Sequence, residues 1–186
     1  MVEANINGVD LKFETLADLF SPKKLDNGTR LLIEAVESVK PDYSSTLDWG
    51  CGWGAIAIYL AKNQPSASVV AIDSDIAAIK TTVANAKLNS VDNLSAILSH
   101  GFDEVDDNIK FDLIASNPPT HRGREVVENM IAQSFDRLEN DGVLLIVVEA
   151  RLKPWISKQL SVVFGDYKIV SRSNKHVVLM AIKISK

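Results

Sequence analysis

The feature that most constrains the fold of this chain is a regular alternation of short β-rich runs with segments of helical periodicity. This alternation is typical of a doubly wound α/β fold, in which helices cover both faces of a mostly parallel sheet. The run 143–148 is wholly apolar, as expected of a strand at the centre of such a sheet. The expected strands are 45–48, 68–73, 94–99, 111–116, 143–149, 166–171 and 175–184, and the expected helices are 29–39, 55–63, 75–88, 124–138 and 154–164.

Both ends of the chain break this alternation. Residues 3–14 are interrupted at Asn7–Gly8 and predict a short β-hairpin, which a polar loop joins to a helix with Thr29 as its N-cap. Near the other end, the two-residue turn Ser173–Asn174 is too short to join parallel strands, so the last two strands are expected to be antiparallel. The predicted fold is a Rossmann-like, mostly parallel seven-stranded sheet with a C-terminal antiparallel hairpin and a short N-terminal β-hairpin.

Two finer patterns predict local details. In the helix 75–88, the spacing indicates the face that packs against the sheet, formed by Ile76, Ile79, Val83 and Ala86. The segment Asn140–Asp141–Gly142 is typical of a turn between the preceding helix and the next strand.

Length and composition limit the kind of protein. A chain of 186 residues is expected to form one domain, 1–186, with 1–28 as an N-terminal hairpin and loop extension and 29–186 as the core. Its single cysteine, Cys51, excludes an internal disulfide and favours a reducing cytoplasm. Neither a signal peptide nor a membrane span is visible, so we expect a cytoplasmic location. The histidines lack the spacing of a metal site, so no metal is expected.

A glycine-rich loop follows the first predicted strand of the core. In the segment Asp48–Gly54, glycines alternate at Gly50, Gly52 and Gly54, which allows a tight turn and a close approach of a ligand to the backbone. Asp73 ends the next strand, where its carboxylate could accept hydrogen bonds from two ribose hydroxyls. The sequence therefore predicts a cofactor that contains adenosine.

The glycine pattern alone leaves two cofactor classes open. Gly50, Gly52 and Ala55 also satisfy the G-x-G-x-x-A pattern of dinucleotide-binding proteins, so an NAD-type oxidoreductase is one alternative. Asp48, just before the first glycine, suits a cationic sulfonium cofactor better than a pyrophosphate. The chain also lacks room for the second substrate domain that dehydrogenases usually carry.

The second motif is Asn117–Pro118–Pro119, directly after an apolar strand. Two prolines fix φ and remove two amide donors, so the turn is rigid and rich in carbonyl acceptors. The Asn117 side-chain oxygen and the Pro118 carbonyl could hold both hydrogens of a planar amine and direct the nitrogen lone pair at a methyl group. A purely structural turn capped by Asn117 is the alternative. The location after a strand of an open α/β sheet favours the chemical interpretation.

With both motifs the chain resembles the class I S-adenosylmethionine-dependent methyltransferases. It is most similar to the small-subunit ribosomal RNA guanine-N2 methyltransferase family and its single-domain relatives. Further segments that carry the resemblance are Phe20–Ser21, Leu25–Thr29, Ala84–Asn89 and His121–Gly123.

The resemblance implies the cofactor S-adenosyl-L-methionine and a set of roles. Asn117, Pro118 and Pro119 would be catalytic and would orient the target amine. The residues implied to bind the cofactor are Asp48, Gly50, Gly52, Gly54, Asp73, Ser74 and Asn117. The residues implied to bind the substrate are Phe20, Thr29, Thr120, His121 and Arg122.

Two positions depart from the family pattern. The family usually has an aromatic residue after the second proline to stack on the target base, whereas this chain has Thr120. His121 or Phe20 would then have to stack in its place. The family often has an acid after the third strand that meets the adenine amine, whereas this chain has Gly101. Asp103 or a backbone group is expected to substitute for it.

The predicted function is methyl transfer to an exocyclic amine of an RNA base, most simply guanine N2 of ribosomal RNA. The net charge of −4 excludes a wholly basic nucleic-acid-binding domain, but three basic pairs lie in loops expected at one edge of the sheet: Lys23 and Lys24, Arg122 and Arg124, and Arg151 and Lys153. The alternatives are a protein glutamine or adenine amine methyltransferase and a non-catalytic subunit with the same fold. A partner protein or the ribosomal particle could add specificity.

Overall fold

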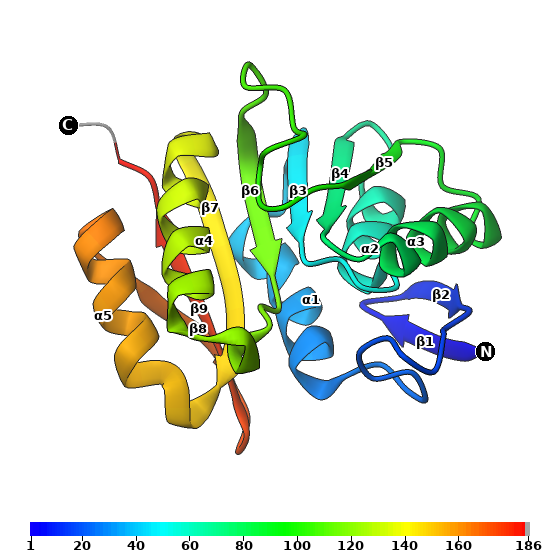
Figure 1. Ribbon diagram of the computed structural model, residues 1–186, viewed down its shortest axis with the longest axis horizontal. Helices are drawn as coiled ribbons and strands as arrows, with labels where there is room; N and C mark the ends of the chain where they lie inside the picture. Colours follow the sequence, from blue (N-terminus) through cyan, green and yellow to red (C-terminus); the bar gives the residue numbers. More distant parts are fainter. Residues whose placement is uncertain (185–186) are drawn as a thin grey trace.

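The computed structural model describes residues 1–184, and its centre is a seven-stranded sheet with the strand order β5-β4-β3-β6-β7-β9-β8 (Figure 1). The strands from β5 to β7 run parallel, whereas β9 is antiparallel to both β7 and β8. The sheet strands are β3 (Ser45–Trp49), β4 (Ser68–Asp73), β5 (Leu94–Leu98), β6 (Phe111–Ser116), β7 (Leu138–Glu149), β8 (Lys168–Arg172) and β9 (His176–Ile182). The predicted doubly wound fold with a closing antiparallel hairpin is confirmed.

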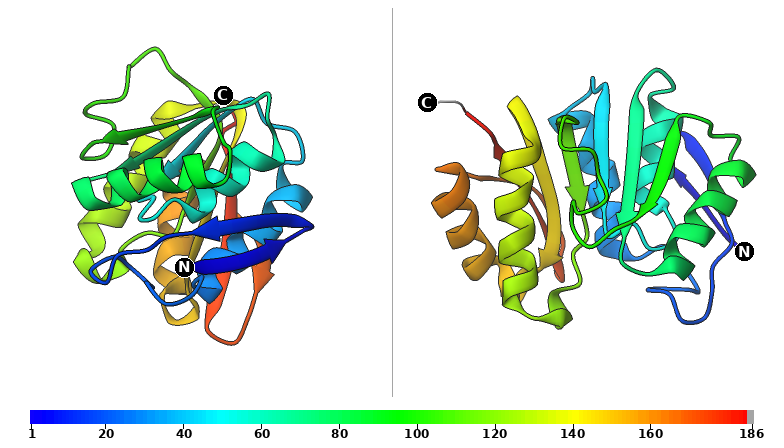
Figure 2. Two further views of the ribbon diagram at one scale, coloured as in Figure 1. Left: turned by 90° about the vertical axis from the view of Figure 1, so that its right-hand side faces the viewer. Right: turned by 45° about the horizontal axis from the view of Figure 1, so that its top comes forward.

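Helices cover both faces of the sheet, as the alternating pattern predicts (Figure 2). On one face lie α1 (Asn27–Val39), α2 (Ala55–Asn63) and α3 (Ile76–Leu88), and on the other lie α4 (Arg124–Arg137) and α5 (Lys153–Phe164). Two short 3-10 turns, η1 (Thr120–Arg122) and η2 (Ala150–Leu152), precede α4 and α5. Each face has its own apolar core, so the sheet is buried on both sides.

The predicted N-terminal hairpin is formed by β1 (Val2–Ile6) and β2 (Val9–Phe13). Two buried asparagines, Asn85 in α3 and Asn89 at its C-cap, fasten it to the core. The side chain of Asn89 pairs with both the N–H and the carbonyl of Lys12, and Asn85 does the same with Glu14. Asn85 also donates to the carbonyl of Trp53 at 2.9 Å. Asn85 therefore connects the end of the hairpin segment with the glycine loop.

Three local expectations are wrong. The N-cap of α1 is Asp26, whose side chain accepts from the backbone N–H of Thr29, so the helix begins two residues before the predicted cap. The predicted inward face of α3 is wrong in part, since Ile79 and Ala86 are buried but Ile76 is 50% exposed and Val83 39%. The segment 140–142 is the irregular first part of the long strand β7, where the pairing with β6 shifts register.

The chain reverses its direction of winding between β3 and β6. From β3 it continues through β4 to the edge strand β5, and it then returns to place β6 on the other side of β3. In open α/β sheets such a switch point leaves a crevice at the carboxyl ends of the strands, where ligands bind. The glycine loop follows β3 and the Asn-Pro-Pro turn follows β6, so both motifs meet there.

Candidate functional site

The glycine loop is tied to the carboxyl end of β4. The backbone N–H groups of Gly50 and Cys51 both donate to the carbonyl of Ile72, at 2.8 and 3.0 Å. Gly50 and Gly52 have φ angles of +77° and +56°, in the left-handed region that favours glycine. A Cβ at either position would meet no atom within 4 Å. The loop therefore turns an open backbone surface toward the space above the sheet.

Gly54, the third predicted cofactor-binding glycine, has a different environment. A Cβ at this position would lie 2.9 Å from the Thr82 Oγ1 on α3. Gly54 is buried and is the N-cap of α2, with a φ of +90°. Helix packing and the left-handed cap together account for glycine here without a ligand.

Asp48 lies under the loop and is fully buried. Its Oδ2 accepts the backbone N–H of Ala57 in the first turn of α2 at 3.0 Å, whereas its Oδ1 has no hydrogen-bond partner. Burial raises the pKa of the Asp48 carboxyl to about 7; the Ala57 hydrogen bond opposes this shift and the nearby Asp73 adds to it. In this arrangement the side chain supports the loop from below and offers no exposed surface to a ligand.

Asp73 lies at the end of β4, as predicted, and its carboxylate contacts the glycine loop directly. Oδ2 accepts from the N–H of Gly52 and Oδ1 from the N–H of Asp75, both at 3.0 Å. Each carboxylate oxygen has a further lone pair. Asp73 can therefore hold the loop and still accept from two hydroxyls of a ligand.

The Asn-Pro-Pro turn lies beside the glycine loop. Trp49 and Ser116 are paired at the ends of β3 and β6, and the Ser116 Oγ donates to the Trp49 carbonyl at 2.7 Å. After the turn, the N–H of Thr120 donates to the Pro118 carbonyl and that of Arg122 to the Pro119 carbonyl, at 2.8 and 2.9 Å. The second of these bonds belongs to the 3-10 turn η1, and both fix the path of the chain away from the strand.

Asn117 is held by the start of α1. Its side-chain Nδ2 donates to the Oδ2 of Asp26 at 3.2 Å and to the Oγ1 of Thr29 at 2.9 Å. The resemblance implies that the loop 26–29 lies near the active site, but it assigns Thr29 to the substrate and Asp26 to no role. In the structure both side chains lie beside the asparagine, and Thr29 is buried. Because the sequence predicted Thr29 as the cap, no sequence signal pointed to Asp26.

The other predicted substrate residues lie around the same carboxyl edge of the sheet. Phe20 is 64% exposed, and its carbonyl accepts from the indole N–H of the buried Trp53 at 2.8 Å. His121 is exposed and Thr120 is half-buried. The guanidinium of Arg122 donates to the Ser74 Oγ at 3.3 Å, so a contact spans from η1 to the residue after β4.

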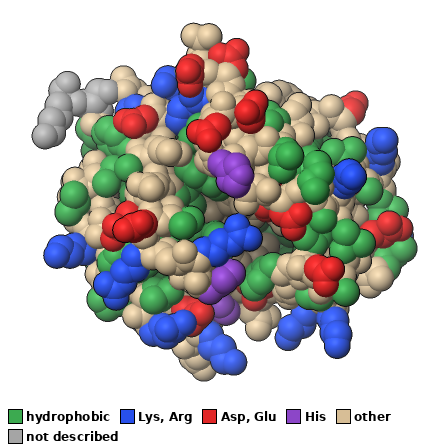
Figure 3. Space-filling model, in the orientation of Figure 1, with side chains coloured by type: hydrophobic (Ala, Val, Ile, Leu, Met, Phe, Trp, Pro, Cys, Tyr) green, Lys and Arg blue, Asp and Glu red, His purple; other side chains and the backbone are tan. Residues whose placement is uncertain are grey.

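Basic side chains gather along the lower rim of the molecule in Figure 3, the edge toward which the parallel strands point in Figure 1. Of the predicted pairs, Lys23 and Lys24 are exposed, whereas Arg124 stacks over the Trp155 ring at 5.3 Å. Arg151 forms an exposed ion pair with Glu149 at 2.6 Å. The N-terminal loop therefore carries the basic pair with the fewest internal contacts.

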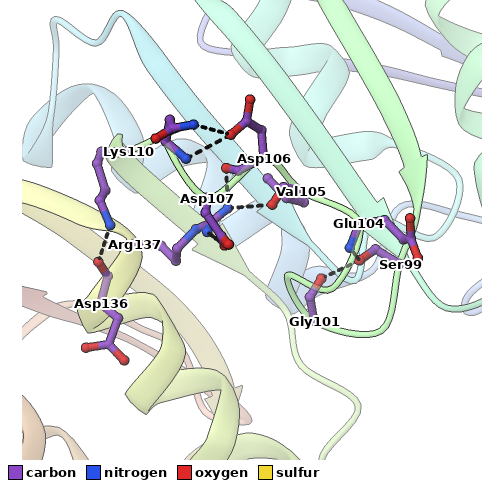
Figure 4. Close-up of polar contacts among 10 residues, drawn as sticks. Ser99, Gly101, Glu104, Val105, Asp106, Asp107, Lys110, Asp136 and Arg137 are labelled. Carbon is purple, nitrogen blue, oxygen red and sulfur yellow. Dashed lines mark hydrogen bonds and ion pairs between the residues drawn. The ribbon is translucent and has the colours of Figure 1, made fainter.

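The loop between β5 and β6 runs from the carboxyl end of β5 to the opposite end of the sheet, where β6 begins and where the last turn of α4 anchors it (Figure 4). The buried Arg137 donates to the carbonyls of Val105 and Asp106 and to the Asp107 carboxylate, at 2.7 to 2.9 Å. Its guanidinium also lies 4.6 Å from the centre of the Phe102 ring. This segment is thus fixed although it contains no regular secondary structure.

Gly101, where the family often has an acid, lies in this loop with a φ of +60°. A Cβ there would lie 2.7 Å from the Gln133 Oε1 of α4. The exposed Gln133 side chain could move to make room, so it is the left-handed conformation that favours glycine at this position. Asp103, proposed as its substitute, is exposed.

Two other kinds of chemistry find no support. Cys51 is buried beside Thr82, and burial raises the pKa of its thiol, which disfavours a nucleophilic thiolate. Among residues 1–184, no three His, Cys, Asp or Glu side chains are grouped closely enough to hold a metal ion.

In the same range, no helix has the length and apolarity required to cross a bilayer.

A comparison with protein families decides among the remaining classes, because the model of the methyltransferase small domain matches residues 10–180. The chain belongs to this family. It is a family of S-adenosylmethionine-dependent methyltransferases, so the choice left open by the glycine pattern falls to the sulfonium cofactor and the NAD-type alternative is wrong. The open faces of Gly50 and Gly52 and the free lone pairs of Asp73 fit the adenosine part of that cofactor.

Individual relatives agree with the family. The chain is 30% identical to the YbxB protein of Bacillus subtilis over 94% of this chain and 87% of YbxB. It is 37% identical to the ribosomal RNA small subunit methyltransferase C of Pseudoalteromonas translucida over 88% of this chain, but over only 47% of that protein. The chain thus spans about half the length of the ribosomal RNA methyltransferases that it matches.

Among solved structures, the Thermus thermophilus 16S rRNA N2 G1207 methyltransferase, in complex with AdoMet and guanosine, matches with a TM-score of 0.88. The sequences are 28% identical, and the match covers 97% of this chain and 49% of that one. Nearly all of this chain therefore corresponds to about half of the T. thermophilus enzyme.

Proposed function

We propose that this protein transfers a methyl group from S-adenosylmethionine to the N2 amine of a guanine in ribosomal RNA. The relatives named as ribosomal RNA methyltransferases support the substrate class, and the T. thermophilus enzyme supports the base and the atom. The site independently supports an amine as the methyl acceptor, because the hydrogen bonds of the Asn117 side chain leave its oxygen free to accept from an amine.

The hydrogen bonds of Asn117 carry the proposal. Its two amide hydrogens are directed to Asp26 and Thr29, so its Oδ1 is the group left to accept a hydrogen bond from a substrate. The Pro118 carbonyl accepts from Thr120 and keeps a second lone pair. These two acceptors can hold both hydrogens of an exocyclic amine.

Hydrogen bonds from both amine hydrogens to these two acceptors have a chemical consequence. The lone pair of an exocyclic amine is delocalised into its base, and acceptors placed on both hydrogens draw the nitrogen toward a tetrahedral geometry in which the lone pair is localised. When bound, S-adenosylmethionine supplies a methyl group made electrophilic by the positive sulfur. The N–C bond forms as the S–C bond breaks, S-adenosylhomocysteine leaves, and the amine then releases one proton. Orientation and electrostatics supply the rate in this scheme.

The cofactor would lie on the open side of the glycine loop. We assign the backbone of Gly50 and Gly52 to close contact with it and the Asp73 carboxylate to the ribose hydroxyls, with Ser74 beside them. Asp48 would act from beneath the loop by fixing the start of α2.

The RNA would approach from the basic rim. The exposed Phe20 ring and the exposed His121 are the candidates to stack on the target base in place of the family aromatic that Thr120 lacks. Lys23 and Lys24 would contact phosphates, as would Arg122. A chain of this length has little surface for recognising a large RNA, so we expect part of the specificity to come from an assembled particle or a partner protein.

The test measures transfer from labelled S-adenosylmethionine into total RNA and total protein. We expect label in RNA with the wild-type protein and none above background with Asn117→Ala, while cofactor binding measured by calorimetry stays within about twofold. Asn129→Ala, an exposed asparagine on α4, is the matched control and should keep full activity. Full activity of Asn117→Ala would contradict the proposed chemistry, and a wild-type protein that binds the cofactor but labels nothing would favour the non-catalytic subunit.

A further inference from the structure

We propose that Asp26 and Thr29 are positioning residues that fix the orientation of the Asn117 side-chain amide. The inference rests on the proposed function, because it explains how the asparagine comes to present its oxygen to an amine. It also reassigns Thr29, for which the resemblance implies a role in substrate binding.

An asparagine amide can rotate by half a turn and exchange its oxygen for its nitrogen at little cost in shape. Here the exchange is strongly disfavoured. It would turn Oδ1 toward the Asp26 carboxylate, 3.2 Å from the present Nδ2, and place two oxygens that only accept hydrogen bonds against each other. The Thr29 hydroxyl, 2.9 Å from Nδ2, can accept or donate, so it anchors the amide while the Asp26 carboxylate selects its orientation. Only one orientation satisfies both neighbours, and in it Oδ1 is directed away from them.

The start of α1 is built to hold these two acceptors. The Asp26 Oδ2 that accepts from Asn117 also accepts the N–H of Thr29 at 3.0 Å, so the helix cap itself fixes the carboxylate. Gly28 leaves room for it, because a Cβ there would lie 2.9 Å from the same oxygen. Thr29 is only 7% exposed, which shields its bond to Asn117 from water.

The helix connects this arrangement to the sheet. Its buried side includes Leu32, Ile33 and Val36, and α1 packs against β7 and β9, on the side of β6 opposite to the glycine loop. The acceptors on α1 and the turn after β6 are therefore held by one rigid body. A cap that is far from Asn117 in sequence can thus set the geometry of the reacting amine.

Thr29→Val is the cleanest perturbation, because valine keeps the size and branching of threonine and removes only the hydroxyl. Thr29→Ser keeps the hydroxyl and is its matched control. The first readout is NMR of the protein without cofactor, in which the Asn117 side-chain amide signals are identified by their loss in Asn117→Ala. We expect slow hydrogen exchange of this amide in the wild type and in Thr29→Ser, and exchange at least about tenfold faster in Thr29→Val.

The second readout is activity. Loss of one hydrogen bond should lower kcat in Thr29→Val about fivefold to tenfold, with the cofactor Kd unchanged and kcat restored in Thr29→Ser. In the Asn117→Ala background the same change should have no further effect, because the group to be oriented is gone.

The outcomes separate this inference from the proposed function. If Asn117→Ala abolishes transfer while Thr29→Val leaves both kcat and the amide exchange unchanged, the positioning role is wrong and the chemistry stands. A wild-type protein that transfers nothing to RNA, with an Asn117 amide still protected by Thr29, would leave the arrangement intact and refute the proposed function.

Discussion

Replacing Asp48 by asparagine should change how the stability of this protein depends on pH. The carboxyl is fully buried, and burial raises its pKa to about 7 from its ordinary value of 3.8. Asparagine has nearly the same shape and retains an oxygen that can accept from Ala57. The substitution therefore removes the titration and preserves the hydrogen bond that supports the glycine loop.

The sign follows from proton binding. Between about pH 4 and pH 7 the unfolded chain has lost the Asp48 proton while the folded protein still binds it, so the contribution to the free energy of unfolding is fully present below pH 4 and is lost as the pH rises to 7. Each pH unit in this window corresponds to about 1.4 kcal/mol. From pH 5 to pH 8 the wild type should thus lose about 3 kcal/mol that Asp48→Asn does not lose.

Urea denaturation of both proteins at pH 5 and pH 8 measures this quantity. The cost of the new amide itself is the same at both pH values and cancels when the two differences are compared. Asp103→Asn, an exposed carboxyl in the β5–β6 loop, controls for the change in net charge. A stability difference between wild type and Asp48→Asn that stays constant from pH 5 to pH 8 would refute the buried, protonated carboxyl.

Other regions give independent tests. Arg137→Lys should lower the free energy of unfolding by about 2–3 kcal/mol in urea titrations, because a lysine cannot bridge the two carbonyls and the carboxylate that the guanidinium joins; an unchanged midpoint would argue against the anchor. Asn89→Ala should accelerate hydrogen exchange of the Lys12 amide about tenfold or more, since that N–H loses its acceptor, with core amides as controls. RNA affinity should fall with rising salt, and Lys24→Ala should reduce the slope by about 1, whereas Lys168→Ala on β8 should not; equal slopes would exclude a phosphate contact at Lys24.

The periodic parts of the fold were predictable from the sequence. The alternation of apolar patterns gave the strand and helix sequence, and the short turn at Ser173–Asn174 fixed the antiparallel end. The two motifs also fell at the predicted place, because the carboxyl ends of neighbouring parallel strands must share an edge. What periodicity could not give was the exposure of Ile76 and Val83, since α3 is also covered by the N-terminal hairpin and its inward face depends on that contact.

The support of the site was the less predictable part. Nothing in the sequence pairs Asp26 with Asn117, because the contact joins a helix cap to a strand end that are brought together only by the packing of α1 on the sheet. Likewise, the spacing of Asp48 and Gly54 predicts a ligand loop, but only their burial shows that these two residues face the protein side of it. Motif spacing identifies the chemistry of the site, whereas tertiary packing determines which residues face a ligand and which hold those residues in position.

The most direct test of the proposed function is nucleoside analysis of RNA labelled by this protein with S-adenosylmethionine, using both free ribosomal RNA and assembled ribosomal particles as acceptors. The account predicts that the label is recovered as N2-methylguanosine and that it disappears with Asn117→Ala. Recovery of the label as N6-methyladenosine, or in protein alone, would contradict it.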